Sequence, residues 1–98
     1  MFDKMKQLME MQKKMQEIKR ELDNTTFEIV SSDGLVKVTM NGSQQVQQVT
    51  IQGEPGGLDK TLLEKSIKDA YNKAIKRSQD VAAQKMKDIT GLSLPGLM

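Results

Sequence analysis

An apolar stripe of heptad period runs along the first 22 residues of the chain. Leu8, Met15 and Leu22 stand seven residues apart, and Met11 and Ile18 fill the second apolar position of the repeat. This spacing is typical of a helix that packs lengthwise on another helix. Such a helix is roughly 33 Å long, which is more than a chain of 98 residues can cover by itself. We therefore expect part of it to meet a partner subunit.

Three short strands follow this helix, which should span residues 2–22 and end before the polar residues 23–26. Apolar and polar residues alternate at 27–29, 36–40 and 46–51. Alternation of this kind is typical of strands with one buried face. The interval of three between Val46 and Val49 breaks the alternation and predicts either a β-bulge or a strand that begins late.

Turn residues separate the strands. Residues 31–34 should form one turn, and Asn41 followed by Gly42 is the strongest hairpin dipeptide in the chain. Residues 53–57 are rich in glycine, but they lack both the Lys-Ser ending of a P-loop and the GxGxxG spacing. We interpret them as a connector rather than as a phosphate cradle.

A second long helix should begin at Asp59 or at Thr61 and end at Thr90, with Gly91 as its stop. Thr61 and Glu64 fit a capping box. The stripe expected to be buried comprises Leu63, Ile67, Ala70, Tyr71, Ala74, Ser78, Val81, Ala82 and Ile89.

The order of helix, three strands and helix predicts a single α+β domain over residues 1–98 with an antiparallel sheet. Residues 92–98 form an apolar tail through which Pro95 excludes a helix. A tail that docks on a neighbour and a flexible tail are both open.

Composition excludes several classes of function. The chain has neither cysteine nor histidine, which removes disulfides, the usual zinc sites and the commonest general base. No set of carboxylates is placed with a nucleophile or a base, so we expect no enzyme, no metal, no cofactor and no small-molecule substrate.

No apolar run reaches the about 18 residues that span a bilayer, and no signal peptide is visible. We therefore expect a cytoplasmic protein without membrane contact.

Charge is nearly balanced along both helices, with 15 basic and 13 acidic residues and a net charge of +2. Acids lie three or four residues from cations in the pairs Asp3–Lys6, Glu10–Lys13, Glu17–Arg20, Glu64–Lys68, Asp69–Lys73 and Lys76–Asp80. This pattern indicates solvated, self-paired helix faces. Because exposed pairs are weak, a DNA phosphate can displace the acidic partner, and such helices suit contact with a duplex backbone.

Phe27 and Tyr71 are expected in the core rather than as stacking platforms for single strands.

The chain resembles the YbaB/EbfC family of bacterial nucleoid-associated proteins along almost its whole length. The resemblance rests on residues 11–16 (MQKKMQ), on 34–42 (GLVKVTMNG), on Val46, Val49 and Ile51, on Leu63, Glu64, Ile67, Ala70, Asn72 and Ala74, and on 85–86, 90–91 and 94–96. It departs from the family in its glycine-rich connector at 53–57 and in the single glycine at 91.

The resemblance implies a tweezers-like homodimer whose sheets join at the centre and whose projecting helices bind double-stranded DNA. The protein would then act in the cytoplasm and nucleoid, in chromosome organisation or gene regulation. The implied DNA contacts are the basic residues of the two helices, namely Lys13, Lys14, Lys19, Arg20, Lys73, Lys76, Arg77, Lys85 and Lys87.

A protein-interaction adaptor is the alternative hypothesis, because the net charge is low. Its helical arms and Met-rich edge would grip another protein, with DNA affinity incidental. Met5 and Met9 lie beside the heptad stripe and are the candidates for that contact surface.

Overall fold

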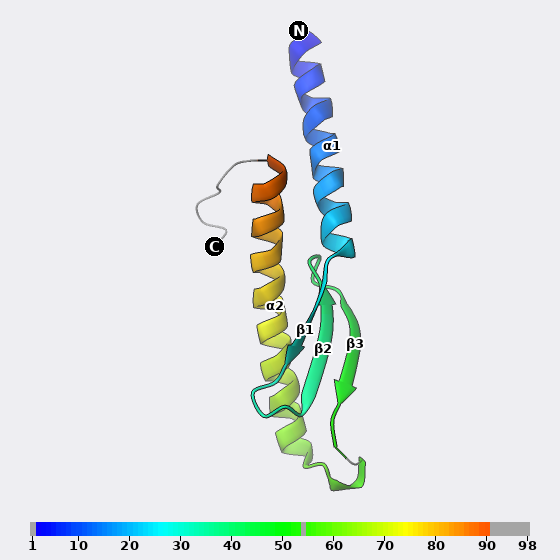
Figure 1. The fold of residues 1–98 in the computed structure, drawn as a ribbon, viewed down its shortest axis with the longest axis vertical. Coiled ribbons are helices and arrows are strands. Elements are labelled where there is room, and N and C mark those ends of the chain that lie inside the picture. Colours follow the sequence, from blue (N-terminus) through cyan, green and yellow to red (C-terminus); the bar gives the residue numbers. More distant parts are fainter. Residues whose placement is uncertain (1, 54, 91–98) are drawn as a thin grey trace.

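The computed structural model describes residues 2–53 and 55–90, and it has the predicted α+β order (Figure 1). The elements are α1 (Phe2–Asn24), β1 (Thr26–Val30), β2 (Val36–Asn41), β3 (Val46–Ile51), a short 3-10 turn η1 (Pro55–Gly57) and α2 (Lys60–Thr90). The expected stop at Gly91 and the tail 92–98 lie outside the described residues. The molecule is elongated, with extents of 67 × 23 × 17 Å, because α1 projects away from the sheet.

The three strands form one antiparallel sheet in the order β1-β2-β3. Thr39 of β2 pairs with Gln48, whereas its neighbour Met40 pairs with Val46. Gln47 is therefore the extra residue of a β-bulge. Of the two alternatives that the interval between Val46 and Val49 left open, the bulge is confirmed and the late start of the strand is not, since β3 begins at Val46. The bulge returns Val46 to the face of the sheet on which Val49 lies.

The core lies between α2 and the central strand. Val36, Val38 and Met40 of β2 are at most 3% exposed, and they pack against Ala70 and Ala74 of α2, which are 0% exposed. The alanines carry only a methyl group, so the helix backbone approaches the sheet closely. Dense packing of this kind is the main source of stability in so small a domain.

The buried stripe of α2 is narrower than predicted. Ile67 and Tyr71 are 42% and 46% exposed within the described chain, so their placement in the core was wrong. The helix buries a row at intervals of four residues through Ser66, Ala70 and Ala74. A residue one step along the chain from this row is turned by about 100° around the helix, which puts both Ile67 and Tyr71 on its flank.

The start of α2 is capped by Asp59. The carboxylate Oδ1 of Asp59 accepts hydrogen bonds from the backbone N–H of Thr61 at 2.8 Å and of Leu62 at 3.2 Å. Asp59 therefore satisfies N–H groups that have no partner within the helix. The capping box expected from Thr61 and Glu64 is not used, because Thr61 is already inside the helix.

The helix α1 is covered only near its carboxyl end. Ile18 is 5% exposed, but Leu8, Met11 and Met15 of the same heptad stripe are 61%, 62% and 57% exposed. The helix runs to Asn24, two residues further than predicted. Within this chain, α1 lies beside α2 over part of its length and is otherwise an uncovered arm (Figure 1).

Candidate nucleic-acid interface

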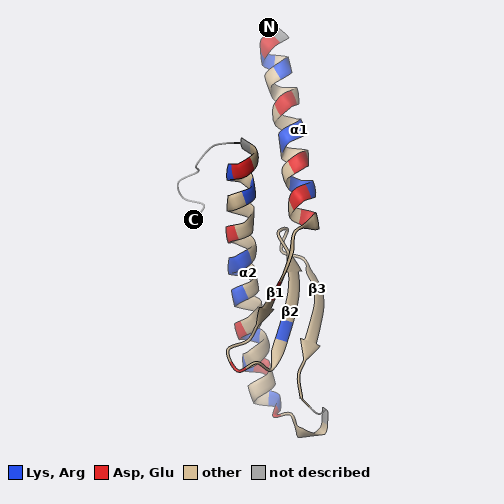
Figure 2. Cartoon of the chain, in the orientation of Figure 1, with Lys and Arg blue, Asp and Glu red and all other residues tan. Residues whose placement is uncertain are grey.

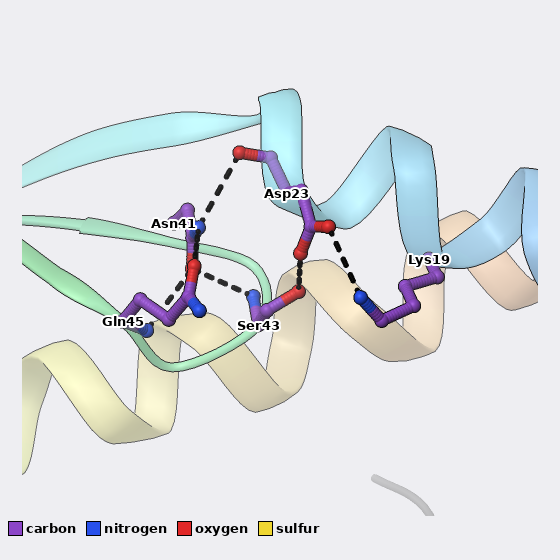
Figure 3. A network of polar contacts seen from close by, with 5 residues as sticks. All are labelled: Lys19, Asp23, Asn41, Ser43 and Gln45. Atoms are coloured by element: carbon purple, nitrogen blue, oxygen red, sulfur yellow. Dashed lines mark hydrogen bonds and ion pairs between the residues drawn. The ribbon is translucent and has the colours of Figure 1, made fainter.

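The root of the α1 arm is held by a polar network with the β2–β3 loop (Figure 3). The Asn41 side-chain amide donates to the Asp23 carbonyl oxygen at 3.3 Å and to Gln45 Oε1 at 2.8 Å. The Ser43 hydroxyl donates to Asp23 Oδ1 at 2.5 Å. Lys19 Nζ lies 3.5 Å from the other carboxylate oxygen of Asp23. These contacts fix the direction in which α1 leaves the sheet.

Two of these partners also lower the pKa of the Asp23 carboxyl group. The hydrogen bond from Ser43 is the larger cause, and the positive charge of Lys19 adds to it. Both favour the ionised form of the carboxyl group.

Gly42 lies directly against the last turns of α1. Its backbone N–H donates to the carbonyl oxygens of Leu22 and Thr25, both at 3.0 Å. The hairpin was predicted at Asn41 and Gly42, and the chain does turn there, but over the four residues 42–45 rather than over a two-residue turn. The positive φ of 62° belongs to Gln44. Gly42 is needed here because α1 leaves no room for a side chain.

A second polar cluster ties the β1–β2 turn to α2. Asp33 Oδ1 accepts hydrogen bonds from the Ser31 hydroxyl at 2.6 Å and from the Leu35 N–H at 3.0 Å, and Asp33 Oδ2 accepts one from the Ser66 hydroxyl. The Ser31 and Ser66 hydroxyls, followed by the Leu35 N–H, lower the pKa of Asp33 to about 2. Gly34 has a φ of 77°, which explains the glycine in this turn.

Lys73, one of the candidate DNA contacts, is engaged in the same region. Its Nζ donates to the Ser32 hydroxyl at 2.7 Å and lies 3.2 Å from Asp69 Oδ2. The backbone N–H of Ser32 donates to the same carboxylate oxygen at 2.8 Å. This N–H is the main cause of a lowered pKa for Asp69, and Lys73 contributes further.

Three of the nine candidate cations have carboxylate partners. Besides Lys73 with Asp69, Lys19 pairs with Asp23 at 3.5 Å. Lys85 Nζ of α2 lies 3.6 Å from Glu21 of α1. The Lys85 pair links the two helices. Sequence spacing does not reveal it, because the two residues are 64 positions apart.

Most of the predicted ion pairs within helices are absent. Of the six pairs expected from spacing, Asp69 with Lys73 is the one that comes within 4.0 Å among the described residues. At an exposed site the Coulomb gain of such a pair barely exceeds the entropy lost in ordering two long side chains. The other pairs therefore need not form.

The remaining candidate cations face solvent. In the parts of the chain that the structure describes, no carboxylate lies within 4.0 Å of their charged groups. These six residues are Lys13, Lys14, Arg20, Lys76, Arg77 and Lys87.

The exposed cations fall into rows on the two helices. Lys13 and Arg20 are seven residues apart on α1, which places them on one face, turned away from buried Ile18. Lys76 and Lys87 are eleven residues apart on α2, or three turns and about 16 Å along one face. Basic residues are spread along both helices rather than gathered in one patch (Figure 2).

One open hollow contains two of the candidate cations. It has a volume of about 350 Å³ and is lined by Thr25, Arg77, Asp80, Val81, Gln84, Lys85 and Asp88. Two carboxylates thus stand beside two cations. The hollow carries no excess positive charge, so it is not a preformed seat for a phosphate group.

Within residues 2–53 and 55–90, no group of three acidic side chains is placed to hold a metal ion. No helix in this part of the chain is long and apolar enough to cross a membrane.

The geometry describes a class of small α+β proteins in which two long helices carry exposed cations and are braced on a three-stranded sheet. Comparisons with known proteins identify the family. The profile of the YbaB/EbfC DNA-binding family matches residues 1–93. A nucleoid-associated protein of Gloeothece citriformis is 43% identical over 103 residues, covering 98% of this chain and 82% of the relative. One of Pelotomaculum thermopropionicum is 39% identical over 97 residues, covering 95% and 90%.

The fold is also found in a solved structure. The crystal structure of an uncharacterized protein from Helicobacter pylori has a TM-score of 0.65 and 21% identity, and it covers 89% of this chain and 98% of that one. The chain belongs to the YbaB/EbfC DNA-binding family.

Proposed function

We propose that the protein binds double-stranded DNA as a homodimer, mainly through phosphate contacts, and acts in the bacterial nucleoid in chromosome organisation or gene regulation. The observation that carries the proposal is the set of exposed cations on two long helices that have no carboxylate partner among the described residues. Membership of a DNA-binding family and relatives named as nucleoid-associated proteins support it.

An uncovered apolar surface on the sheet supports the homodimer. Val46, Val49 and Ile51 pair with Met40, Val38 and Val36, so they lie on the face of the sheet that carries the core. Because α2 packs mainly on β2 and β1, these side chains of β3 remain 44%, 51% and 43% exposed. A second copy that covers them would complete the core and protect the edge strand β3.

The helix surfaces favour a duplex over a single strand. Single-strand binders stack bases on aromatic side chains beside their cations. Tyr71 lies five residues before Lys76, on a different face of α2. Phe27 packs against the core. The exposed rows of cations suit contact with a phosphate backbone without base stacking.

A gel-shift titration on random double-stranded DNA tests the DNA-binding part of the proposal. Phosphate contacts predict a loss of affinity of orders of magnitude between about 50 and about 200 mM salt. Lys76→Gln with Lys87→Gln should reduce the slope of log K against log salt by about 1 for each phosphate that a lysine no longer neutralises. Lys37→Gln, on the sheet beside Glu28 at 3.9 Å, is the matched control. If the wild type, the double variant and Lys37→Gln show the same slope of log K against log salt, Lys76 and Lys87 are not part of the interface.

Sedimentation equilibrium tests the dimer. Val49→Lys should convert a dimer into a monomer, because it places a charge on the apolar surface of β3. Val30 is equally exposed, at 48% against 51% for Val49. Since Val30 pairs with Lys37, it lies on the opposite face of the sheet, and Val30→Lys should leave the dimer intact. A wild-type protein that is monomeric at micromolar concentration would contradict the homodimer.

The adaptor alternative is favoured by the exposure of Met5 and Met9, which are 66% and 59% exposed. It predicts that Met5→Glu with Met9→Glu abolishes binding to a protein partner and leaves DNA affinity unchanged. Failure to bind random DNA even at low salt would make this the function to pursue.

A further inference from the structure

The apolar stripe of α1 extends beyond the end of its neighbouring helix. Ile18 is buried, whereas Met15, Met11 and Leu8, the next residues of the same stripe, are 57–62% exposed. Because the stripe has heptad spacing, all four lie on one face of α1. The exposed residues therefore continue the buried face of α1 towards its amino end.

The end of α2 lies beside this uncovered part. The two helices run antiparallel side by side (Figure 1), and Lys85 pairs with Glu21 at 3.6 Å. Thr90 is the last residue of α2, five residues after Lys85. Helices of equal rise bring Thr90 about level with Gln16 on α1. The chain that follows Thr90 therefore starts where the exposed stripe starts.

The composition of the following segment matches the stripe. Residues 91–98, GLSLPGLM, contain three leucines and a methionine and no charged side chain. Pro95 prevents the helix from continuing through them. In an extended conformation these eight residues reach about 26–29 Å, whereas the stripe from Met15 to Leu8 is about 10 Å long.

We propose that residues 91–98 fold onto the α1 arm of their own chain and cover Leu8, Met11 and Met15. The segment takes over the position that a longer α2 would occupy, and it does so with an extended strand of apolar side chains. Lys13 and Arg20 lie on the opposite face of α1. The docked segment therefore leaves the cation row of the arm exposed, and the inference does not depend on DNA binding.

Methionine oxidation by hydrogen peroxide, followed by peptide mass spectrometry, tests this docking. Met9 is the internal control, because it is as exposed as Met11 and Met15, at 59% against 62% and 57%, but lies outside the stripe, about 100° around the helix from Leu8. In the full chain Met11 and Met15 should oxidise several-fold more slowly than Met9. In a chain that ends at Thr90 their rates should rise to that of Met9.

Two results of the oxidation experiment would overturn the docking. One is equal rates for all three methionines in the full chain. The other is protection that survives the truncation, since a second copy or another surface would then cover the stripe. Leu94→Ser with Leu97→Ser keeps the chain length and should behave like the truncated chain. Far-UV circular dichroism checks that both variants retain their helices.

A cysteine pair distinguishes the chain's own segment from that of a second copy. The chain has no cysteine, so Met15→Cys with Leu94→Cys introduces the one possible disulfide partner on each side. Air oxidation should give an intrachain disulfide, seen as a monomer of altered mobility on a non-reducing gel. Met9→Cys with Leu94→Cys is the control and should not cross-link. A covalent dimer from the first pair, or no cross-link at all, would overturn the assignment.

Discussion

Replacing Gly42 with alanine should loosen the joint between the α1 arm and the sheet. A methyl group at this position would lie 2.8 Å from Leu22 Cδ2 and 3.2 Å from both Cα and the carbonyl oxygen of Leu22. The side-chain end can swing away, but the backbone atoms of Leu22 belong to the last turns of α1. The helix must therefore shift, and its hydrogen bonds from Gly42 and Asn41 lengthen.

The size of the effect follows from two opposing terms. Overpacking at a tight contact costs about 1–3 kcal/mol. Any Gly→Ala change also gains about 0.4–1 kcal/mol from the reduced entropy of the unfolded chain. Gly56→Ala isolates this gain, because a methyl group at Gly56 meets nothing within 4 Å. The two variants should therefore differ by about 1–3 kcal/mol, with Gly42→Ala the less stable.

Thermal unfolding followed by far-UV circular dichroism measures the difference at one fixed protein concentration. In a domain of this size 1 kcal/mol corresponds to about 4–8 °C in Tm. The Tm of Gly42→Ala should thus lie at least about 4 °C below that of Gly56→Ala. If the two variants melt together, α1 adjusts freely at its root and the reasoning from close approach fails.

Three further predictions concern other polar contacts. The lowered pKa of Asp33, about 2, means that its contribution is present above the unfolded value near 3.8 and is lost as pH falls through about 2. The gap in urea midpoint between wild type and Asp33→Asn should therefore be wider at pH 6 than at pH 2, and an unchanged gap would contradict this. Asp59→Ala should cost about 0.5–2 kcal/mol in urea unfolding, whereas Thr61→Ala should cost much less, because Asp59 is the cap. Ser78→Ala removes a buried hydrogen bond to the Asn41 carbonyl at 3.1 Å and should cost about 0.5–1.5 kcal/mol by the same assay.

The elements of the fold could be predicted from local patterns, because each depends on neighbours in the chain. The heptad stripe gave α1, and alternation gave the strands. The interval between Val46 and Val49 indicated a bulge or a late strand start, and the structure has the bulge, at Gln47. In each of these cases the residues that carry the pattern lie within a few positions of one another, and the regular geometry of a helix or strand converts that spacing into a shared face.

Contacts across the chain could not be predicted in the same way. The buried Ser66 was missed because its partner, Asp33, is 33 residues away, and serine on a helix carries no apolar signal. Tyr71 was placed in the core because the width of the stripe depends on how many strands α2 covers. Gly42 was assigned to the right turn, but its close approach to Leu22 depends on where α1 ends in space.

The candidate site was predictable only as a set of helix faces. Sequence spacing gave the rows of cations, but it could not show that Lys85 is engaged by Glu21, since that contact joins two helices. Nor could it show that Lys73 reaches Ser32. Which of the unpaired cations touch DNA stays a prediction.

The joint between Asp23, Asn41 and Ser43 makes α1 a lever with its fulcrum at one end. From Asp23, at the fulcrum, to Phe2 the helix extends about 32 Å. A rotation of about 10° at the fulcrum therefore displaces the tip by about 5–6 Å. Small adjustments at the sheet are thus amplified into large displacements of the tip of α1.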